Sequence, residues 1–398
     1  MKTVSMKILV VLLVIVFLST VLLTATFTYL ATTNMYGPIA ENPSLNAKVQ
    51  EIRKLITDKY YKPVDETKLD IGMLKGLVFG LNDPYSTYMT AEETQKFLED
   101  EQGNYQGIGI QVTQNPETYE IKITGVFKDS PAKKAGLLPG DIIIAVDGTD
   151  VTAMNVDEVV PMMRGEQGTQ VKVTVLRGEE TMEYDIIRDV VNIEYVKWHM
   201  PPNGIGYVQI SEFSGNCAEK FNEAVDDLKA RGMKALIIDL RDNPGGLVDQ
   251  TSAIADILLP QGIIFYTLDR QGVRKDENAS PGALDIPMAV LVNENSASAS
   301  ELLSGALQDN GVPLIGTKTF GKGIIQSFIS LKDGDTLKLT ISEYFTPEGR
   351  EIQGIGLTPD YIVELPEELQ GRPDLLNDSN DTQLQKALEV IEGKLASL

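Results

Sequence analysis

One serine lies among small residues directly after an apolar run. Ser298 belongs to the segment 293–301 (NENSASASE), which follows Met288–Val292. Ser298 and Glu301 have the S-x-x-E spacing of a capping box, which predicts the start of a helix. The same position suits a nucleophile, because small neighbours leave the hydroxyl accessible and a helix N-terminus stabilises a developing negative charge. Both interpretations are open from this segment alone.

A glycine-containing loop, 241–246 (RDNPGG), follows a second apolar run, Ala235–Leu240. It is typical of a strand-to-helix turn in which glycines supply positive φ. It also suits a nest of backbone N–H groups that binds an anion. Neither a G-K-[ST] triplet nor Rossmann glycine spacing is present, so an oxyanion fits this loop better than a nucleotide phosphate.

A lysine lies between two glycines in the segment 319–326 (TFGKGIIQ). A lysine in a turn is normally solvated, but Phe320, Ile324 and Ile325 could desolvate Lys322 and lower its pKa. A fall from ~10.4 to ~7–8 corresponds to roughly 4 kcal/mol and would make the amine a general base. Gln326 could then orient this amine by a hydrogen bond.

The chain has one histidine, His199, and one cysteine, Cys217. His199 lies in 198–202 (WHMPP), which predicts a linker rather than a catalytic site. Two such ligands are too few for an ordinary zinc site, and one cysteine forms no internal disulfide. A Ser-Lys pair is therefore the remaining common means of activating a hydroxyl, and no metal or cofactor is expected.

Composition excludes some classes of protein. The 398 residues include 35 Lys and Arg against 57 Asp and Glu, a net charge of −22. Such a balance disfavours nucleic-acid binding, which needs cations to replace phosphate counterions. Hydrophobic residues make up 42% of the chain, enough for buried cores, and the length suggests two or three domains.

The elements that must position these loops alternate between strands and helices from Gly206 onward. Ala235–Leu240 leads into a helical pattern at Leu247–Leu259, and Met288–Val292 leads into Glu301–Leu307. This alternation predicts a layered α/β core.

Short β-type runs separated by turns occupy the region between Gly107 and Arg188. One helical piece, Val156–Arg164, contains Pro161, which should interrupt it. The predicted strands are Ile121–Val126, Asp141–Val146, Val171–Leu176 and Met182–Ile187.

Helical patterns occur near both ends of the chain. The first begins at Leu45, the second covers Ile71–Leu81, and a third starts at Thr90 with Glu93 in capping-box spacing. A last helix is predicted at Leu384–Leu395. Helical segments of this kind make a homodimer plausible.

An uncharged apolar run, Ile8–Leu30, is 23 residues long and therefore long enough to span a bilayer. Lys2 and Lys7 precede it and the next charge is Glu41. The positive-inside rule places the N-terminus in the cytoplasm and the remainder outside, as a single-pass protein of the cell membrane. A cleaved signal peptide is the alternative, although the run is long for one.

Several of these segments resemble the carboxy-terminal processing peptidases, also called tail-specific proteases. The resemblance covers roughly residues 45–398. Segment 130–148 is similar to the PDZ domains of exported proteases. The segments that match the protease part are 239–247, 296–301, 319–326, 346–350 and 354–360.

The resemblance implies a serine protease with a Ser-Lys dyad, an assisting glutamine and an embedded PDZ domain. By motif match, these catalytic roles fall on Ser298, Lys322 and Gln326. The resemblance also implies that backbone N–H groups at Gly245, Gly246 and Ala299 donate to the oxyanion. In the PDZ domain it implies that a peptide carboxylate is bound by Gly107, Ile108, Gly109 and Ile110. Arg164 would couple the PDZ domain to the protease. The chain departs from the family pattern at Asn295, where glycine is common, and at Pro161.

The sequence therefore predicts a mixed α/β multidomain, membrane-anchored exported endopeptidase. Its PDZ domain would bind unstructured apolar C-terminal tails of proteins. A non-catalytic membrane-tethered PDZ scaffold and an enzyme acting on thioesters are the alternatives. The predicted parts are a cytoplasmic N-terminus (1–7), a transmembrane helix (8–30), a tether (31–44), a helical segment (45–105), a PDZ domain (106–190), a protease core (191–365) and a C-terminal linker and helix (366–398).

Overall fold

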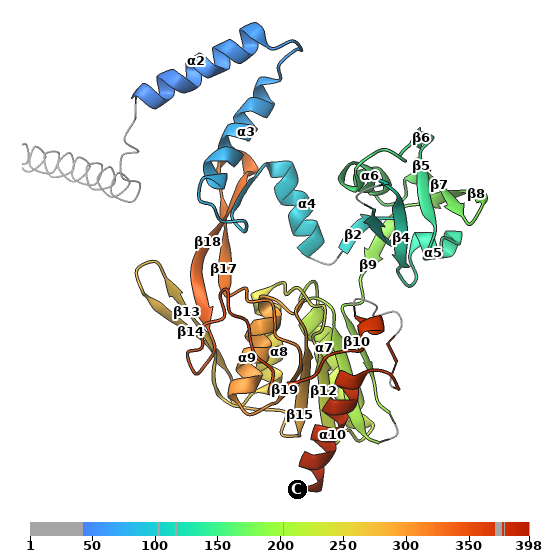
Figure 1. Ribbon diagram of the computed structural model, residues 1–398, viewed down its shortest axis with the longest axis vertical. Coiled ribbons are helices and arrows are strands. Elements are labelled where there is room, and N and C mark those ends of the chain that lie inside the picture. Colours follow the sequence, from blue (N-terminus) through green and yellow to red (C-terminus); the bar gives the residue numbers. More distant parts are fainter. Residues whose placement is uncertain are drawn as a thin grey trace, which may run out of the picture. The chain divides into compact units, whose positions relative to one another are not determined.

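The computed structural model describes residues 43–101, 104–115, 118–201, 203–370, 376–377 and 379–397 (Figure 1). Its contacts divide the chain into two compact units, with the boundary between Met73 and Leu74. The predicted transmembrane segment 8–30 lies outside the described residues. Within the described ranges, no helix combines the length and apolar character that crossing a membrane requires.

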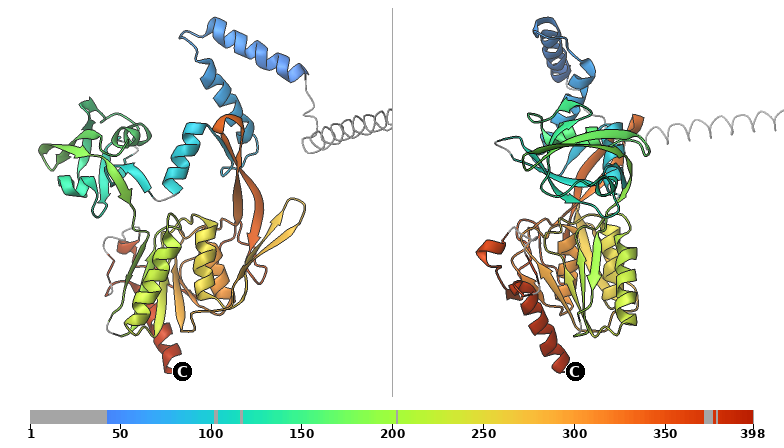
Figure 2. Two further views of the ribbon diagram at one scale, coloured as in Figure 1. Left: turned by 180° about the vertical axis from the view of Figure 1, so that it is seen from behind. Right: turned by 90° about the vertical axis from the view of Figure 1, so that its right-hand side faces the viewer.

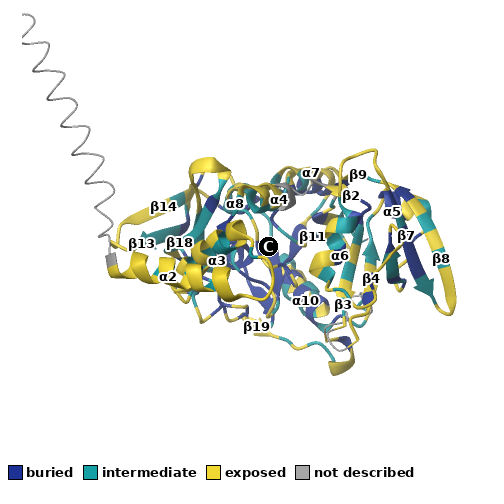
Figure 3. Cartoon of the chain, turned by 90° about the horizontal axis from the view of Figure 1, so that it is seen from above, coloured by how far each residue is buried: buried dark blue, intermediate teal, exposed yellow. Residues whose placement is uncertain are grey.

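The first unit contains α2 (Pro43–Lys59) and the start of α3 (Glu66–Phe79). Both helices were predicted, but α3 begins earlier than expected. Arg53 of α2 pairs with Glu66 and Asp70 of α3. Much of α2 is solvent-exposed (Figure 3); its exposed apolar residues are Leu45, Ile52 and Leu55.

The second unit begins with the end of α3, a turn, the short strand β1 (Thr87–Met89) and α4 (Ala91–Glu101). The predicted capping box starts α4. Glu93 Oε2 accepts from the Thr90 N–H at 3.0 Å, and Thr90 Oγ1 accepts from the Glu93 N–H at 3.3 Å. This local prediction is confirmed, because both bonds depend only on neighbours in the chain.

The β-rich region forms an antiparallel sheet in the order β3-β4-β5-β7-β8, with β6 paired to β5. Two strands, β2 (Asn104–Gly107) and β9 (Asp189–Asn192), pair where the chain enters and leaves this module. The module's elements are β3 (Ile110–Gln114), β4 (Ile121–Val126), α5 (Pro131–Ala135), β5 (Ile142–Val146), β6 (Thr149–Asp150), α6 (Val156–Met163), β7 (Gln170–Arg177) and β8 (Glu180–Ile187).

Pro161 does not interrupt α6, contrary to the sequence-based expectation. The helix runs through it to Met163 and begins with a capping box between Asn155 and Glu158. Val159 and Met163, on either side of the proline, are buried in the module's core. Apolar burial and N-capping together outweigh the single hydrogen bond that proline removes.

A six-stranded sheet forms the centre of the α/β core, in the order β10-β11-β12-β15-β16-β19. β10 is antiparallel to β11, and the other pairs are parallel. The strands are β10 (Val196–His199), β11 (Ile205–Ile210), β12 (Ala235–Asp239), β15 (Met288–Val292), β16 (Leu314–Gly316) and β19 (Tyr361–Ile362).

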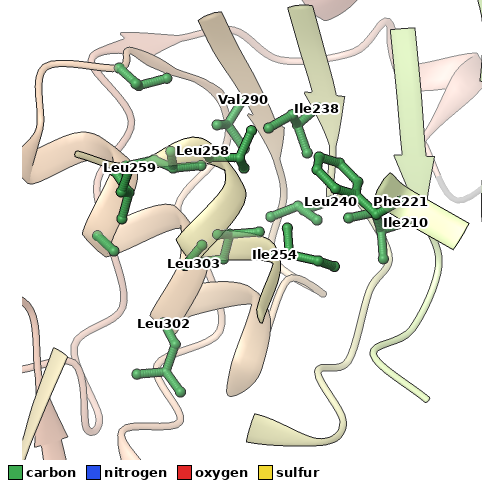
Figure 4. Close-up of a cluster of buried hydrophobic side chains, with 14 of the residues drawn as sticks. Ile210, Phe221, Ile238, Leu240, Ile254, Leu258, Leu259, Val290, Leu302 and Leu303 are labelled. Carbon is green, nitrogen blue, oxygen red and sulfur yellow. The ribbon is translucent and has the colours of Figure 1, made fainter. Parts of the chain in front are cut away.

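Helices cover both faces of this sheet (Figure 2). One face packs on α7 (Cys217–Ala230), α8 (Val248–Leu258) and α9 (Ala299–Asp309), and Figure 4 shows part of that core. The other face packs on α10 (Thr382–Ala396). Burial on both sides explains why the first four residues of β12 and all of β15 form continuous apolar runs.

A second, antiparallel sheet adjoins the core and was not predicted. Its order is β1-β18-β13-β14, and β17 also pairs with β18. The strands are β13 (Gly262–Asp269), β14 (Arg274–Ala279), β17 (Ile324–Ser330) and β18 (Thr336–Phe345); short 3₁₀ turns are η1 (Lys332–Gly334) and η2 (Glu367–Leu369).

The segment around His199 is a strand, not the expected linker. Val196–His199 forms β10 and pairs with β11 in the register His199 to Tyr207. The prolines that suggested a linker follow the strand, so they end it rather than prevent it.

Candidate active site

Three predicted loops meet at one cleft of about 460 Å³. Ser298, Lys322 and Gln326 line it together with Gly245 and Gly246. The parallel sheet explains part of this meeting. The loops that hold Ser298 and the glycines follow adjacent strands, β15 and β12, and so leave the same edge of the sheet.

Ser298 lies at the sharp turn between β15 and α9. Its backbone has φ 55° and ψ −115°, a conformation that a non-glycine residue rarely adopts. It is the N-cap of α9, and its side chain is half-buried at the cleft. The strained turn presents the hydroxyl at the N-terminus of the helix, as a nucleophile requires.

The glycine loop packs tightly against this turn. A Cβ atom on Gly245 would lie 2.8 Å from Ser298 Cβ and 2.9 Å from Ala299 N. Gly245 and Gly246 also have φ of 109° and 132°. Both the space and the backbone conformation therefore require glycine.

Hydrogen bonds outside the cleft join the same two loops. Asp242 Oδ1 accepts from Asn293 Nδ2 at 2.9 Å and from Asn295 Nδ2 at 2.8 Å. Asn295, the departure from the family pattern, thus ties the nucleophile loop to the glycine loop.

One of the three predicted oxyanion donors already has an acceptor. The Gly245 N–H donates to Asn243 Oδ1 at 2.9 Å. Gly246 lines the cleft, and the Ala299 nitrogen lies at the start of α9 next to Gly245.

The lysine loop is fixed by its two glycines and by the segment that follows β18. A Cβ atom on Gly323 would lie 2.4 Å from Gln353 N. The Gly323 N–H donates to Gln353 Oε1 at 2.8 Å, and Gly321 has φ 94°. In segment 354–360, which the sequence matched to the protease part, the Gly354 N–H donates to the Gly321 carbonyl oxygen at 2.8 Å. Gln353 and this segment therefore shape the backbone on which Lys322 lies.

The environment of the Lys322 amine differs from the prediction. Phe320 is 58% exposed and contributes little to desolvation, whereas Ile324 is 9% exposed. The ring of Tyr85 lies 4.6 Å from Lys322 Nζ, so an aromatic face from the turn before β1 contacts the amine instead.

Gln326 lies at the cleft, near the start of β17. Its Nε2 donates to the Thr340 hydroxyl of β18 at 3.2 Å. The hydrogen bond that fixes the amide therefore comes from the adjacent strand.

Glu301 connects the nucleophile loop with the lysine loop. Its carboxylate is fully buried and accepts from Ser298 N–H at 3.0 Å, Gly321 N–H at 2.7 Å and Lys322 N–H at 2.8 Å. The Thr319 hydroxyl donates a fourth bond at 2.6 Å. The capping-box spacing indicated only the first of these, because the other donors come from a loop distant in sequence.

Tyr344 of β18 contacts both loops from the opposite side. Its hydroxyl hydrogen-bonds the carbonyl oxygens of Ser298, at 2.8 Å, and Lys322. Complete burial, together with the Glu301 charge, raises the pKa of Tyr344 well above its usual value. Tyr344 is therefore a neutral hydroxyl, and no motif in the sequence indicated it.

The β-rich module has its own groove of about 170 Å³. Ile108, Gly109, Ile110 and Arg164 line it, together with apolar residues of β3 and α6. Gly107 instead belongs to β2, where it pairs with Asp189. A groove beside a strand and a helix suits an added peptide strand.

Family models match both the protease core and the β-rich module. The model of peptidase family S41 matches residues 204–363, and a PDZ domain model matches 122–177. A third model, the N-terminal domain of the activating protease CtpB, matches 31–94.

Whole-chain relatives decide the family. A probable CtpA-like serine protease of Staphylococcus haemolyticus is 36% identical, over 89% of this chain and 73% of the relative. The carboxy-terminal processing protease CtpA of Bacillus subtilis is 38% identical, over 80% and 69%. This chain belongs to the carboxy-terminal processing proteases of family S41.

A solved structure supports the same assignment. The photosystem II D1 C-terminal processing protease aligns with a TM-score of 0.52 at 29% identity, covering 84% of this chain and 92% of that one. A putative S41 protease from Bacteroides fragilis shares the fold, with a TM-score of 0.55. As a carboxy-terminal processing protease, the chain is a serine-type peptidase with a PDZ domain, and the alternative of a non-catalytic scaffold loses its support.

The described part of this S41 protease contains no group of three or more His, Cys, Asp and Glu side chains placed to hold a metal ion. Sequence reasoning missed Tyr344, which lines the cleft. It also missed Tyr85, whose ring contacts Lys322 Nζ, and Thr340, which bonds Gln326.

Proposed function

We propose that this protease cleaves peptide bonds with a Ser298–Lys322 dyad. The observation that supports the proposal is that Ser298, Lys322 and Gln326 line the same cleft as Gly245 and Gly246. Lys322 Nζ takes the proton of the Ser298 hydroxyl as Ser298 Oγ attacks the substrate carbonyl carbon. The resulting oxyanion accepts from the N–H groups of Gly246 and Ala299, at the glycine loop and the N-terminus of α9.

The remaining steps return both residues to their starting state. The Lys322 ammonium gives its proton to the leaving amine, the C–N bond breaks, and an acyl-enzyme on Ser298 remains. Water then attacks the acyl carbon and gives a proton to Lys322. As the second tetrahedral intermediate collapses, the bond from the acyl carbon to Ser298 Oγ breaks and the Lys322 ammonium gives its proton to Ser298 Oγ, which releases the carboxylic acid and restores the Ser298 hydroxyl and the Lys322 amine.

Substrates are proteins with unstructured apolar C-terminal tails. The groove beside β3 and α6 is mainly apolar, and Ile108, Gly109 and Ile110 are among the residues that line it. A tail would add as a strand to β3 with its carboxylate at the backbone N–H groups of that segment. Arg164, also at this groove, is proposed to couple tail binding to the protease core.

The proposed location is the extracytoplasmic face of the cell membrane. The uncharged run 8–30 would anchor the chain, and the two lysines before it would keep the N-terminus in the cytoplasm. Exposed apolar residues on α2 and α3 support a homodimer; these include Leu45, Leu55, Leu77 and Phe79.

Mass spectrometry of a substrate with an apolar unstructured tail tests the dyad and the tail requirement together. The full chain in detergent should cleave it, and Ser298→Ala and Lys322→Ala should not. Lys318→Ala is the matched control, because Lys318 is an exposed lysine of the same loop. Full activity of Lys322→Ala would refute the dyad, and equal cleavage of a tail-less substrate would refute tail recognition.

Cell fractionation and sedimentation test the anchor and the dimer. The full chain should stay with membranes after alkaline extraction, and a variant lacking 8–30 should not. Sedimentation of the full chain in detergent should give twice the chain mass. A monomer at micromolar concentration would refute the dimer.

A further inference from the structure

The turn before β1 lies at the catalytic lysine although its sequence carries no motif for catalysis. Asp83 and Tyr85 belong to this turn, and Tyr85 has its ring 4.6 Å from Lys322 Nζ. An aromatic face at this distance stabilises an ammonium group. Both Tyr85 and Lys322 are half-buried, so water screens this contact only in part.

The turn is rigidly built. Asp83 Oδ1 accepts from the Tyr85 N–H at 3.0 Å, and Asp83 Oδ2 accepts from the Ser86 hydroxyl at 2.6 Å. Ser86 is buried, and its hydroxyl oxygen accepts from the Thr340 N–H at 3.0 Å. Tyr85 is thus held by its own turn and, through that turn, by β18.

The adjoining strand fixes the turn further. β1 pairs with β18 in the register Thr87 to Lys338 and Met89 to Thr336. Asp335, directly before β18, accepts hydrogen bonds from the Tyr88 hydroxyl and from the Ala91 N–H. The placement of Tyr85 therefore follows from regular strand pairing.

The Asp83 carboxylate lies within reach of the Lys322 charge and is linked to Gln326 through Thr340. Burial raises the pKa of Asp83, but hydrogen bonds from Ser86, Thr340 and the Tyr85 N–H, together with the Lys322 charge, hold it below its usual value. The Thr340 hydroxyl that bonds Asp83 is the one that accepts from Gln326 Nε2. Gln326, Thr340 and Asp83 thus form a chain of hydrogen bonds that ends beside the lysine.

We propose that Tyr85 and Asp83 are positioning residues of the active site, which hold the Lys322 ammonium at the cleft and set the pH at which it becomes a base. The proposal rests on the proposed function of Lys322 as the base. The aromatic face and the carboxylate both favour the charged amine. They therefore stabilise the ammonium that forms when Lys322 takes the Ser298 proton, and they oppose loss of that proton in the resting enzyme.

Other groups contact the Lys322 backbone or line the same cleft, and they stay constant in the test. The Glu301 carboxylate binds the Lys322 backbone N–H, and the Tyr344 hydroxyl binds its carbonyl oxygen. The charged residues that line the same cleft are Glu212, Asp249 and Lys338.

The test is the pH dependence of kcat/KM for a tailed substrate, measured with the full chain. Tyr85→Leu removes the aromatic face, and Asp83→Asn removes the charge while keeping an oxygen for the Tyr85 N–H. Each should move the rising limb of the profile to lower pH by about 0.5 to 1 unit. Tyr85→Phe keeps the aromatic ring, so the rising limb of its pH profile should lie at the same pH as in the parent protein.

Matched controls exist elsewhere in the chain. Tyr361→Leu removes a ring that lies 5.1 Å from Lys386 Nζ at the C-terminal helix. Asp150→Asn changes a similar turn, in which the carboxylate accepts from Thr152. Neither should move the limb.

The outcomes separate this inference from the proposed function. A limb unmoved in both Tyr85→Leu and Asp83→Asn, with Lys322→Ala inactive, would overturn the positioning role alone. Wild-type turnover by Lys322→Ala would overturn the dyad, and the positioning role with it. Melting temperature and tail binding by the PDZ domain identify a variant that fails to fold, and the other variant then decides.

Discussion

At the scale of single residues, one buried carboxylate organises the active site. Glu301 accepts four hydrogen bonds from the two loops that supply Ser298 and Lys322. A buried acceptor of this kind is stable only because each of its oxygens receives hydrogen bonds from two donors. The same bonds use the Ser298 N–H, so the proposed oxyanion contact falls to the next nitrogen, Ala299.

Glu301→Gln should weaken the hydrogen bonds that join the loops of Ser298 and Lys322. The variant loses the charge and presents an amide N–H₂ to backbone donors, so we expect a loss of about 2–4 kcal/mol in the free energy of unfolding. Turnover should fall roughly 10- to 100-fold because the nucleophile and base are misplaced. Glu294→Gln, at an exposed position of the same loop, is the control. Equal activity of the two variants would contradict this role.

Cys217 should be inert in the native protein. Burial, with a smaller effect of the Glu212 charge, raises the pKa of its thiol to about 12. Only roughly one thiol in 10⁴ is ionised at about pH 8. Iodoacetamide should therefore leave the native chain unlabelled and active, as mass spectrometry and an activity assay would show, and should label it in denaturant. Loss of activity on native labelling would contradict the buried state.

At the scale of elements, an ion pair joins β7 of the PDZ module to the residue before β5. Asp141, directly before β5, is 1% exposed and accepts from Arg177 of β7 through Nε at 2.6 Å and Nη2 at 2.7 Å. Hydrogen bonds from Arg177 lower the pKa of Asp141, against the opposing effect of burial. The folded pKa thus lies below the unfolded value of about 3.9.

Because the pKa of Asp141 is lower in the folded than in the unfolded state, the pH range in which the ion pair stabilises the module is defined. Its contribution is complete above the unfolded pKa and is lost as the pH falls through the folded pKa. Asp141→Asn should lower the melting temperature at about pH 7, and the difference from the parent should narrow below about pH 4. Scanning calorimetry of both proteins at several pH values measures this difference in melting temperature. A constant difference across that range would contradict the assignment.

At the scale of the whole protease core, the C-terminal helix is tied to the glycine loop. Arg241, which begins that loop, is 8% exposed and pairs with Asp239 at 2.6 Å and with Asp381 at 2.8 Å. Asp381 is also the N-cap of α10 and accepts from the Leu384 N–H at 2.9 Å. The far end of the chain thus stabilises the segment before Gly245.

Asp381→Asn removes the ion pair with Arg241 but keeps the N-cap of α10, since asparagine caps a helix as well as aspartate does. Arg241 keeps Asp239 and Gln383 as partners, so the loss of one charged partner should cost roughly 1–3 kcal/mol, and Asp381→Ala should cost more. Chemical unfolding followed by fluorescence measures this, because the chain's single tryptophan, Trp198, lies in β10 of the same core. An unchanged midpoint for Asp381→Asn would show that the pair contributes nothing.

Much of the site could be predicted from the sequence because its rules are local. Apolar runs followed by small or glycine-rich segments predicted β12 and β15 and the helices after them, and the capping box at Thr90 is confirmed. Ser298 at the start of α9 follows from the same short-range chemistry. The S41 and PDZ assignments rest on contiguous motifs, which are also local.

Only the tertiary structure decided what surrounds the catalytic groups. Strand pairing between β1 and β18 brings Tyr85 to Lys322, whereas Phe320, two residues from the lysine, is mostly exposed. Glu301 gains three of its four donors from a distant loop. Which strands pair over long distances depends on which combination buries the most apolar surface. The periodicity of a single segment shows that it has an apolar face, but it does not determine which other segment covers that face.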